Sequence, residues 1–429
     1  MIDYRFSRIA SQVRGSAIRE LLRDALRPGM ISLAGGLPQA ELFDVPGIRR
    51  AAEAVFDRQP RTALQYGRTE GQESLQSALA AHLIQRGIRV EAGAIQVTTG
   101  SQQALDLIAR AFLDEGDCVA LEVPTYLAAV QAFDLRSARY LAIPTDADGA
   151  DIGGLASSSL SNPAALPKIV YVVSNFANPT GASLSLERRR ALLRWAAERR
   201  VFVLEDDPYG ELRFSGVGPP PLWALARDIP GASAWCGYAS SLSKIVAPGL
   251  RIGWIVLPPP VAEVVTRLKQ ALDLHTSSFV QEIAAHYLRG GELEPRLAIA
   301  RTTYSAQCSA LSEALLEHLG DELTFNAPAG GMFLWCRFRE RIDTAALLPH
   351  ARDCGMIFVP GAVFYPFDGD TSTLRLSFAT QPPEGLREGA RRLAKALQLY
   401  RAAQSGRPQL PAGGPLTERG TTGPGAGSG

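Results

Sequence analysis

The chain has 429 residues, 46% of them hydrophobic and 20% charged, the balance of a folded enzyme with room for two or three domains at roughly 100–200 residues each. Its 44 basic and 43 acidic residues leave a formal charge of +1, which argues against nucleic-acid or anionic-membrane partners. Five scattered cysteines without a CxxC pair argue against a disulfide framework or a metal site and suit a reducing cytosol. The N-terminal residues lack the apolar core of a signal peptide, and the most apolar stretch, Ile252–Leu257, is too short to span a membrane, so we expect a cytoplasmic protein.

Short β-branched runs alternate with helical patterns through the first two thirds of the chain. This alternation predicts βαβ units and an α/β fold with a large, mainly parallel sheet covered by helices on both faces. In such a sheet, ligands bind beyond the carboxyl ends of the strands. The predicted strands are Ile95–Thr99, Cys118–Leu121, Tyr140–Ile143, Ile169–Val173 and Val201–Glu205, and the predicted helices are Ala104–Leu113, Leu127–Leu135 and Leu186–Arg200.

From about residue 289 the pattern becomes that of a smaller α+β domain. The predicted elements are a helix near Pro295–Leu319, a hairpin at Ala329–Phe338 containing a Gly-Gly pair, a helix at Thr344–Cys354, strands at Ile357–Val359 and Thr373–Phe378, and an amphipathic helix at Glu384–Tyr400. We predict that residues 46–288 form the large domain, and that residues 1–45 join residues 289–402 in the small one. Residues 403–429 are rich in glycine and proline and lack apolar side chains to offset ordering entropy, so the sequence predicts a disordered tail.

Lys244 is the first residue that suggests chemistry, at the end of the segment Ser240-Ser241-Leu242-Ser243-Lys244. A lysine nucleophile must be deprotonated, so it needs burial or a neighbouring cation to lower its pKa. Arg251 offers such a cation, and the hydroxyls of Ser241 and Ser243 are good donors to a phosphate. Taken alone, the segment also fits a solvated lysine before an ordinary turn.

Two further polar segments follow predicted strands. Ser101 and Gln102 follow Gly100 at a predicted helix start, which fits an anion site and equally an ordinary capped helix. Asp206 and Tyr209 lie in Glu-Asp-Asp-Pro-Tyr, residues 205–209. Buried carboxylates need a cationic partner such as a protonated pyridine, although an acidic cluster can also cap a helix or bind a metal. No histidine lies nearby in sequence to support a metal.

Asn178 and Tyr126 come from segments with little specificity of their own. Asn178 begins Asn-Pro-Thr-Gly, a common turn sequence that follows the strand Ile169–Val173. Tyr126 ends Pro-Thr-Tyr and fits either a core aromatic or a ring that stacks on a flat ligand.

Taken together and in this order, the segments GSQQ, PTY, NPTG, DDPY and SxSK with the downstream arginine resemble the class I/II aminotransferases of fold type I, which use pyridoxal 5′-phosphate (PLP). The resemblance extends from residue 31 to about residue 400. The phrases SLAGGLP, LQYG, GSQQALDL, FLDEGD, GGMFLW and TLRLSFA make it closest to the α-aminoadipate and kynurenine aminotransferase branch. It implies ping-pong transfer of an amino group between an L-amino acid and a 2-oxo acid, with glutamate and 2-oxoglutarate as one pair, by a homodimer with shared active sites.

The resemblance also implies roles for single residues. For the cofactor, Lys244 would carry PLP and move the substrate proton, Asp206 would pair with the ring nitrogen, Tyr209 and Asn178 would bind the 3′-oxygen, and Tyr126 would stack on the ring. The phosphate would be held by Ser101, Gln102, Ser241, Ser243 and Arg251, together with Tyr66 of the neighbouring subunit. For the substrate, Arg375 would clamp the α-carboxylate, with Asn178 beside it and Gly36 allowing close approach of the backbone.

Two segments bear on the substrate side chain. The family usually has Pro-x-Phe-Gln before NPTG, whereas this chain has Ser174-Asn175-Phe176-Ala177, which we expect on the pocket side. Arg19 matches the helix position at which the aminoadipate branch binds a distal carboxylate, and it fits equally well as a surface arginine of an amphipathic helix. The sequence therefore leaves the amino donor open.

Two other functions stay open at this point. Another PLP reaction on the same fold, such as β-elimination or decarboxylation, would use the same motifs. An aminotransferase-like effector domain of a transcription regulator would follow a basic winged-helix domain, for which the resemblance leaves no room because it begins within the first few tens of residues.

Overall fold

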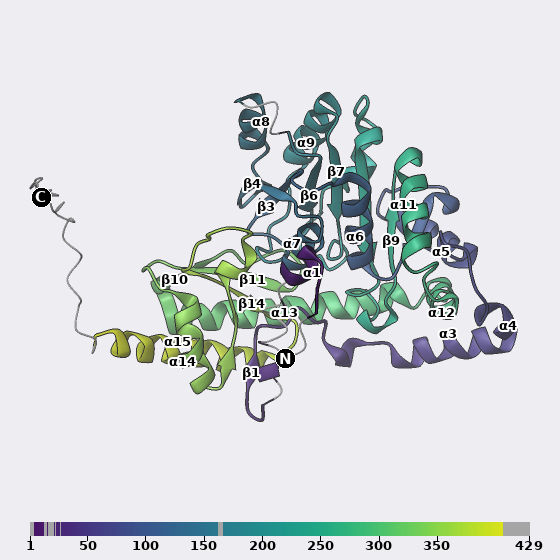
Figure 1. Cartoon of the computed structure of the whole chain (residues 1–429). Helices are drawn as coiled ribbons and strands as arrows, with labels where there is room; N and C mark the ends of the chain where they lie inside the picture. Colours follow the sequence, from purple (N-terminus) through teal and green to yellow (C-terminus); the bar gives the residue numbers. More distant parts are fainter. Residues whose placement is uncertain are drawn as a thin grey trace, which may run out of the picture.

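The computed structural model describes residues 4–12, 15, 21, 23–25, 27–161 and 166–405. Within these residues, eight strands form one sheet in the order β2-β9-β8-β7-β6-β3-β4-β5, in which β9 and β5 run against the direction of the others (Figure 1). The α/β prediction with a mainly parallel large sheet is confirmed. The strands are β2 Ile95–Thr98, β3 Cys118–Val123, β4 Arg139–Asp146, β5 Gly149–Ala150, β6 Ile169–Val173, β7 Phe202–Asp206, β8 Cys236–Ser241 and β9 Gly253–Val256.

The sheet separates two apolar layers because successive side chains of a strand point to opposite faces. On β6, Val170 and Val172 belong to one buried cluster, whereas Tyr171 and Val173 belong to another. The first cluster includes side chains of α8 (Ile152–Ser161), α9 (Leu186–Arg199) and α10 (Leu222–Ala226). The second includes side chains of α6 (Ser101–Phe112) and α7 (Leu127–Asp134). Helices therefore cover both faces, as the buried β-branched runs predict.

A second, antiparallel sheet has the strand order β10-β11-β14-β13 and lies beside α14 and α15 in Figure 1. A short parallel pairing of β1 with β12 brings residues 31–32 next to residues 356–357, so the N-terminal segment contacts the C-terminal part. The division into domains at residues 45, 288 and 402 stays a prediction. The elements here are β1 Ile31–Ser32, α13 Leu293–Leu319, β10 Leu323–Phe325, β11 Phe333–Phe338, α14 Thr344–Asp353, β12 Met356–Ile357, β13 Val359–Pro360, β14 Thr373–Ser377 and α15 Pro383–Ser405.

Two predictions for this part need correction. The hairpin predicted at Ala329–Phe338 has the wrong bounds: its second strand is β11, which pairs antiparallel with β10, so the hairpin begins at Leu323. The Gly-Gly pair lies in the loop between these strands and also permits close packing, since a Cβ on Gly330 would come within 2.3 Å of the Phe176 ring. The last helix extends to Ser405 and so includes residues 403–405 of the predicted tail, whereas residues 406–429 lie outside the described residues.

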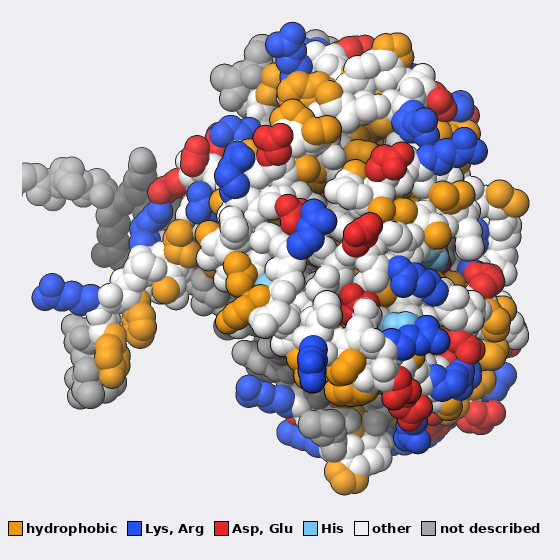
Figure 2. All heavy atoms as spheres, turned by 90° about the vertical axis from the view of Figure 1, so that its right-hand side faces the viewer, with side chains coloured by type: hydrophobic (Ala, Val, Ile, Leu, Met, Phe, Trp, Pro, Cys, Tyr) orange, Lys and Arg blue, Asp and Glu red, His pale blue; other side chains and the backbone are white. Residues whose placement is uncertain are grey.

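The remaining helices are α1 Arg8–Gln12, α3 Val45–Arg58, α4 Pro60–Ala63, α5 Glu73–Ile84, α11 Pro259–Leu272 and α12 Ser278–Arg289. No helix within the described ranges is long and apolar enough to cross a membrane. On the face shown in Figure 2, basic and acidic side chains are interspersed, in keeping with a formal charge of +1.

Arg189 is a fully buried cation that ties α9 to the segment after β6. Its Nη2 donates to the Ser174 carbonyl (2.6 Å) and to Asn175 Oδ1 (2.8 Å). Its Nε donates to the Leu184 carbonyl (2.8 Å), and Nη1 lies 3.6 Å from Glu205 Oε1. Buried polar groups are stable only when they are paired, so this one side chain stabilises several acceptors near the carboxyl ends of β6 and β7.

We expect Arg189→Met to lower the free energy of unfolding by about 3–5 kcal/mol, because it leaves the buried Ser174, Leu184 and Asn175 acceptors without their donor and the Glu205 carboxylate without the cation beside it. The matched control is Arg190→Met, which changes the adjacent exposed arginine and should shift stability by no more than about 0.5 kcal/mol. Urea unfolding of both variants at one protein concentration measures the difference. Equal stabilities would contradict this account of Arg189.

Candidate active site

A cleft of about 1820 Å³ opens beyond the carboxyl ends of β3, β6, β7 and β8, where a parallel sheet is expected to bind its ligand. Tyr66 does not line it and is 78% exposed, and Arg19 lies outside the described residues. The cleft is lined by all the other predicted site residues, namely Gly36, Ser101, Gln102, Tyr126, Asn178, Asp206, Tyr209, Ser241, Ser243, Lys244, Arg251 and Arg375.

Lys244 lies in the turn after β8, and its Nζ donates to the Gly36 carbonyl (2.7 Å). Burial lowers the pKa of Lys244 to about 8, and the Arg375 and Arg251 cations add to this effect. Roughly a tenth of the amine is therefore neutral, and nucleophilic, at pH 7, far more than for a lysine of ordinary pKa. The Gly36 backbone lies close to Phe333, whose Cζ would be 3.2 Å from a Cβ at that position.

Two of the three consecutive acids at the end of β7 are occupied by structural partners. Glu205 accepts hydrogen bonds from Ser174 Oγ (2.6 Å) and from the Leu222 backbone N–H (2.9 Å). Asp207 accepts from Arg86 (2.5 Å) and Asn175 (2.8 Å). Within the described residues, no three His, Cys, Asp or Glu side chains are arranged to bind a metal ion.

Asp206 is the acid that faces the cleft, and it is only 2% exposed. Its Oδ2 accepts from the Tyr171 hydroxyl (2.9 Å), while its buried Oδ1 has no hydrogen-bond partner among the described residues. Burial raises the pKa of Asp206 to about 7, and the neighbouring Asp207 and Glu205 act in the same direction. A buried carboxylate oxygen without a donor fits a protonated ring nitrogen of PLP.

The start of α6 and Arg251 bring groups that favour anions together at another part of the cleft. Gly100 precedes α6 with φ +77°, and a Cβ there would come within 2.5 Å of Arg251 Nη2, so glycine permits the guanidinium to approach. Ser101, Ser241 and Ser243 add hydroxyl groups to this wall. Helix N–H groups, hydroxyls and an arginine fit the phosphate of PLP. The Gln102 side chain, in contrast, donates to the Ala128 carbonyl (3.0 Å).

Arg375 is a buried cation without a carboxylate partner among the described residues. Its Nη1 donates to Asn178 Oδ1 (2.7 Å) and its Nη2 to the Ala34 carbonyl (2.6 Å), while Nε has no partner within the described chain. Its guanidinium carbon lies 4.3 Å from the centre of the Phe333 ring and 4.9 Å from that of Phe364. Burial lowers the pKa of Arg375 to about 10, so it stays charged at neutral pH and fits the carboxylate of a substrate.

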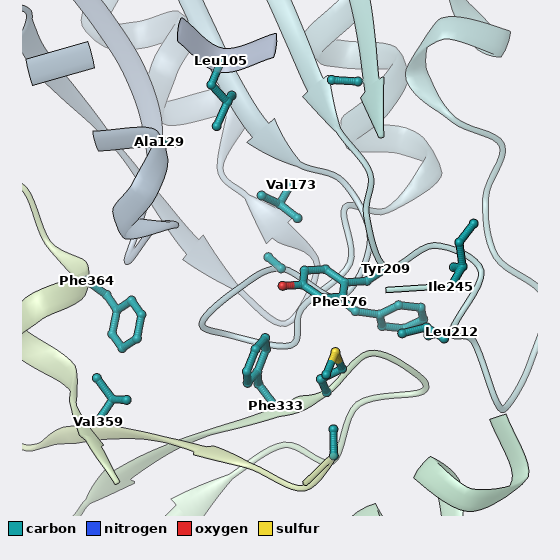
Figure 3. Packing of buried hydrophobic residues seen from close by; sticks show 14 of the residues in the cluster. Leu105, Ala129, Val173, Phe176, Tyr209, Leu212, Ile245, Phe333, Val359 and Phe364 are labelled. Carbon is teal, nitrogen blue, oxygen red and sulfur yellow. The ribbon is translucent and has the colours of Figure 1, made fainter. Parts of the chain in front are cut away.

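Tyr126 and Tyr209, the two cleft tyrosines that the sequence predicts, are neutral hydrogen-bonding groups at physiological pH. Burial raises the pKa of Tyr126 to about 12 and that of Tyr209 further. Tyr209 meets Phe333 edge to face, with ring centres 5.9 Å apart. In Figure 3, Phe333, Val359 and Phe364 from the C-terminal part approach Tyr209 and Val173 from the other side of the same apolar cluster.

The segment Ser174–Ala177 does not line the cleft, so the expectation that it lies on the pocket side is wrong. Ser174 and Asn175 turn to Glu205 and Asp207, and the Phe176 ring packs under Arg213 (4.6 Å). The departure from the family pattern therefore concerns the support of the acids rather than the substrate pocket.

Sequence reasoning missed three side chains that contact site residues without lining the cleft: Tyr171, Phe333 and Phe364. The strand pattern could have predicted Tyr171, since it lies two residues before Val173 on one strand and therefore on the same face of the sheet. Phe333 and Phe364 follow glycine-containing loops of the C-terminal part, and nothing in their spacing relates them to Arg375.

Residues 29–393 match the family model of the class I and II aminotransferases, and the chain belongs to this family. It is 38% identical over 395 residues to a 2-aminoadipate transaminase of Thermus thermophilus, covering 92% of this chain and 96% of that protein. It is 39% identical over 402 residues to aromatic-amino-acid aminotransferase 1 of Thermococcus litoralis, covering 92% of this chain and 95% of that protein. The crystal structure of an α-aminoadipate aminotransferase from Thermus thermophilus, in complex with N-(5′-phosphopyridoxyl)-L-leucine, has a TM-score of 0.84 at 37% identity and covers 93% of this chain and 98% of that one.

The protein is therefore a PLP-dependent aminotransferase of fold type I, in the aminoadipate and kynurenine aminotransferase-like branch. This confirms the predicted enzyme class and cofactor, and it favours them over the other PLP reactions and the regulator domain that the motifs left open.

We expect the covalent attachment of PLP to Lys244 to become faster as pH rises to about 8 and to level off above, because the amine loses its proton over this range. A lysine in water, with a pKa of about 10.4, would keep gaining reactivity beyond pH 10. Apoprotein is mixed with PLP at a series of pH values and quenched with borohydride at short times, and peptide mapping of the labelled fraction gives the rate of attachment. Label on another lysine, such as the buried Lys269, would refute the assignment.

Proposed function

We propose that this aminotransferase transfers the amino group between an L-amino acid and a 2-oxo acid by a ping-pong mechanism, with glutamate and 2-oxoglutarate as one substrate pair. The observation that carries the proposal is the presence, in one cleft, of a lysine with a lowered pKa, a buried carboxylate and a buried arginine. Within the described part of the chain, the carboxylate has an oxygen without a hydrogen-bond partner and the arginine has no carboxylate partner. Burial of each of these groups is unfavourable in the free protein, and each has a chemical partner in PLP or in the amino acid substrate.

For the cofactor, we infer that Asp206 holds the ring nitrogen in its protonated form, while Tyr209 and Asn178 donate to the 3′-oxygen and Tyr126 lies against the ring face. When bound, PLP supplies the electron sink that stabilises the carbanion left by removal of the α-proton. The phosphate is held by the N–H groups at the start of α6 with Ser101, Gln102, Ser241, Ser243 and Arg251. The exposure of the Arg251 side chain keeps this end open to a further ligand from outside the chain.

For the chemistry, we infer that Lys244 Nζ takes the α-proton from the amino acid and returns it during the transfer. A base works best when its pKa lies near the working pH, and a pKa of about 8 meets this condition. Arg375 and Asn178 orient the substrate α-carboxylate, with the Gly36 backbone alongside, and the apolar walls exclude water that would protonate the carbanion at the wrong place.

The substrate proposal assigns different carboxylates to two arginines: the α-carboxylate to Arg375 and a distal carboxylate to Arg19. We expect Arg375→Ala to reduce kcat/KM for every donor and acceptor by about 2–5 kcal/mol of transition-state binding, because it removes a buried charged contact common to all of them. We expect Arg19→Ala to raise KM for glutamate and 2-oxoglutarate alone, since Arg19 is proposed to recognise only a distal carboxylate. Single-turnover half-reactions with glutamate and with leucine, followed by the 2-oxo acid formed, measure both effects.

Equal losses with glutamate and leucine in the Arg19 variant would assign that residue a structural role. No 2-oxo acid from either substrate with the PLP-loaded wild-type enzyme would refute the proposed reaction.

We further propose a homodimer in which Tyr66 binds the phosphate in the neighbouring subunit. Tyr66 is 78% exposed and outside the cleft of its own chain, and its ring lies edge-on to His275 at 5.8 Å. His275 Nε2 also accepts from the Gly67 backbone N–H (3.2 Å), which fixes the segment that carries Tyr66. An exposed aromatic side chain on an ordered segment is suited to contact a second subunit.

We expect a mixture of Lys244→Ala and Tyr66→Ala proteins to be more active than either protein alone after subunit exchange. In each mixed dimer, one site has the intact Lys244 of one chain and the intact Tyr66 of the other, while the second site lacks both. As the Lys244→Ala protein is added in increasing excess, each Tyr66→Ala chain enters a mixed dimer with one intact site. The activity per mixed dimer should therefore approach half of the activity of a wild-type dimer, which has two intact sites. No gain despite proven exchange would contradict a shared site.

We also propose that the enzyme works in the reducing cytosol. Its five cysteines are free thiols, three of them buried, and no pair is bridged.

A further inference from the structure

Tyr171 and Asp206 lie on neighbouring parallel strands and on the same side of the sheet. In the register of β6 with β7, Val173 pairs with Asp206 and Tyr171 pairs with Leu204. Because side chains alternate along a strand, Tyr171 points to the face of Val173, diagonally behind Asp206. The Tyr171 hydroxyl reaches the carboxylate from there and donates to Oδ2 at 2.9 Å.

The Tyr171 hydroxyl is held in place by the packing of its ring. Tyr171 is fully buried, and its ring meets Phe133 of α7 edge to face with centres 5.9 Å apart. Burial and the adjacent Asp206 raise the pKa of Tyr171 well above its ordinary value, so the hydroxyl keeps its proton at every physiological pH. Tyr171 is therefore a fixed donor to one oxygen of Asp206.

The hydrogen bond to Oδ2 determines the orientation of the other carboxylate oxygen of Asp206, Oδ1. Oδ1 is buried and lacks a partner among the described residues, while Asp206 lines the cleft. A hydrogen bond to a carboxylate favours its charged form, which here opposes burial and the repulsion from Asp207 and Glu205. Without the hydroxyl, the acid would gain a proton more readily and would be free to rotate.

We propose that Tyr171 is a positioning residue for the cofactor: its hydroxyl keeps the Asp206 carboxylate ionised and turned so that Oδ1 meets the ring nitrogen of PLP. The inference rests on the proposed role of Asp206 and adds a residue that does not itself line the cleft. It predicts that Tyr171 acts on the protonation of the ring nitrogen and only through Asp206.

The chain offers a matched control in Tyr238 on β8. Tyr238 is also fully buried, and its hydroxyl donates to Oδ2 of Asp207 at 3.3 Å. Asp207 is held by Arg86 and Asn175 and does not line the cleft. Tyr238→Phe thus removes an equivalent buried hydroxyl from the adjacent acid.

The test compares wild type, Tyr171→Phe and Tyr238→Phe loaded with PLP that carries ¹⁵N in the ring. In wild type, the ¹⁵N resonance should report a protonated nitrogen at neutral pH. In Tyr171→Phe it should move toward the unprotonated position, and the Kd for PLP should rise on the order of 10-fold, as for the loss of a hydrogen bond to a charged group. Tyr238→Phe should leave both measurements at the wild-type values.

The same measurements in an Asp206→Asn background decide whether the effect passes through the acid. Tyr171→Phe should change neither the resonance nor the Kd further in that background, because coupled residues are not additive. If Tyr171→Phe does not fold, 3-fluorotyrosine at position 171 serves instead, since it is a stronger donor and should keep the ring nitrogen protonated to a higher pH.

A wild-type resonance in Tyr171→Phe, an equal shift in Tyr238→Phe, or a full additional shift in the Asp206→Asn background would each overturn the inference. Absence of 2-oxo acid formation by wild type would instead refute the proposed reaction, and a protonated ring nitrogen in Asp206→Asn would refute the role of Asp206. The outcomes are therefore distinguishable.

Discussion

The cleft depends on charged groups that are buried without a charged partner of their own. Asp206 and Arg375 are 2% and 1% exposed, and each keeps a polar atom without a partner among the described residues. Burial of such groups is unfavourable in the free protein, and a ligand with the opposite charges offsets the cost. Asp206 ends β7 of the large sheet and Arg375 lies within β14 of the second sheet, so only the folded chain brings them together.

Next to Asp206, the polar side chains that support the acidic segment are paired with one another. Arg189, Asn175 and Asp207 form a chain of hydrogen bonds beside the strand ends, which leaves Asp206 as the one acid of its segment with a free oxygen among the described residues. A satisfied buried network is rigid, whereas a partly satisfied one is the first place to relax. The contrast between neighbouring acids in one strand thus defines where the ligand binds.

Much of this arrangement was predictable from sequence, and the failures have physical causes. Strand and helix periodicity predicted the parallel sheet, and the motif order predicted residues such as Lys244 and Asp206 that line the cleft. The hairpin predicted at residues 329–338 has the wrong bounds because its first strand, Leu323–Phe325, is only three residues long and lies before the loop that holds the Gly-Gly pair. That loop also packs against Phe176, which is distant in sequence. Tertiary packing also decides that Asn175 faces Asp207 instead of the pocket, which no local pattern contains.

The two ends of the cleft differ in a way that bears on assembly. Around Asp206 and Arg375 the protein supplies its own walls, whereas at the anion site Arg251 and Gln102 are exposed. Exposed charge contacts are weakened by water and salt, so an open site binds phosphate less firmly than a covered one. Tyr66 is an exposed aromatic residue that has no use in its own chain's cleft. A second copy that covers the anion site with Tyr66 would reduce the exposure of both surfaces at once, and cofactor affinity and dimer formation would then be two expressions of the same contact.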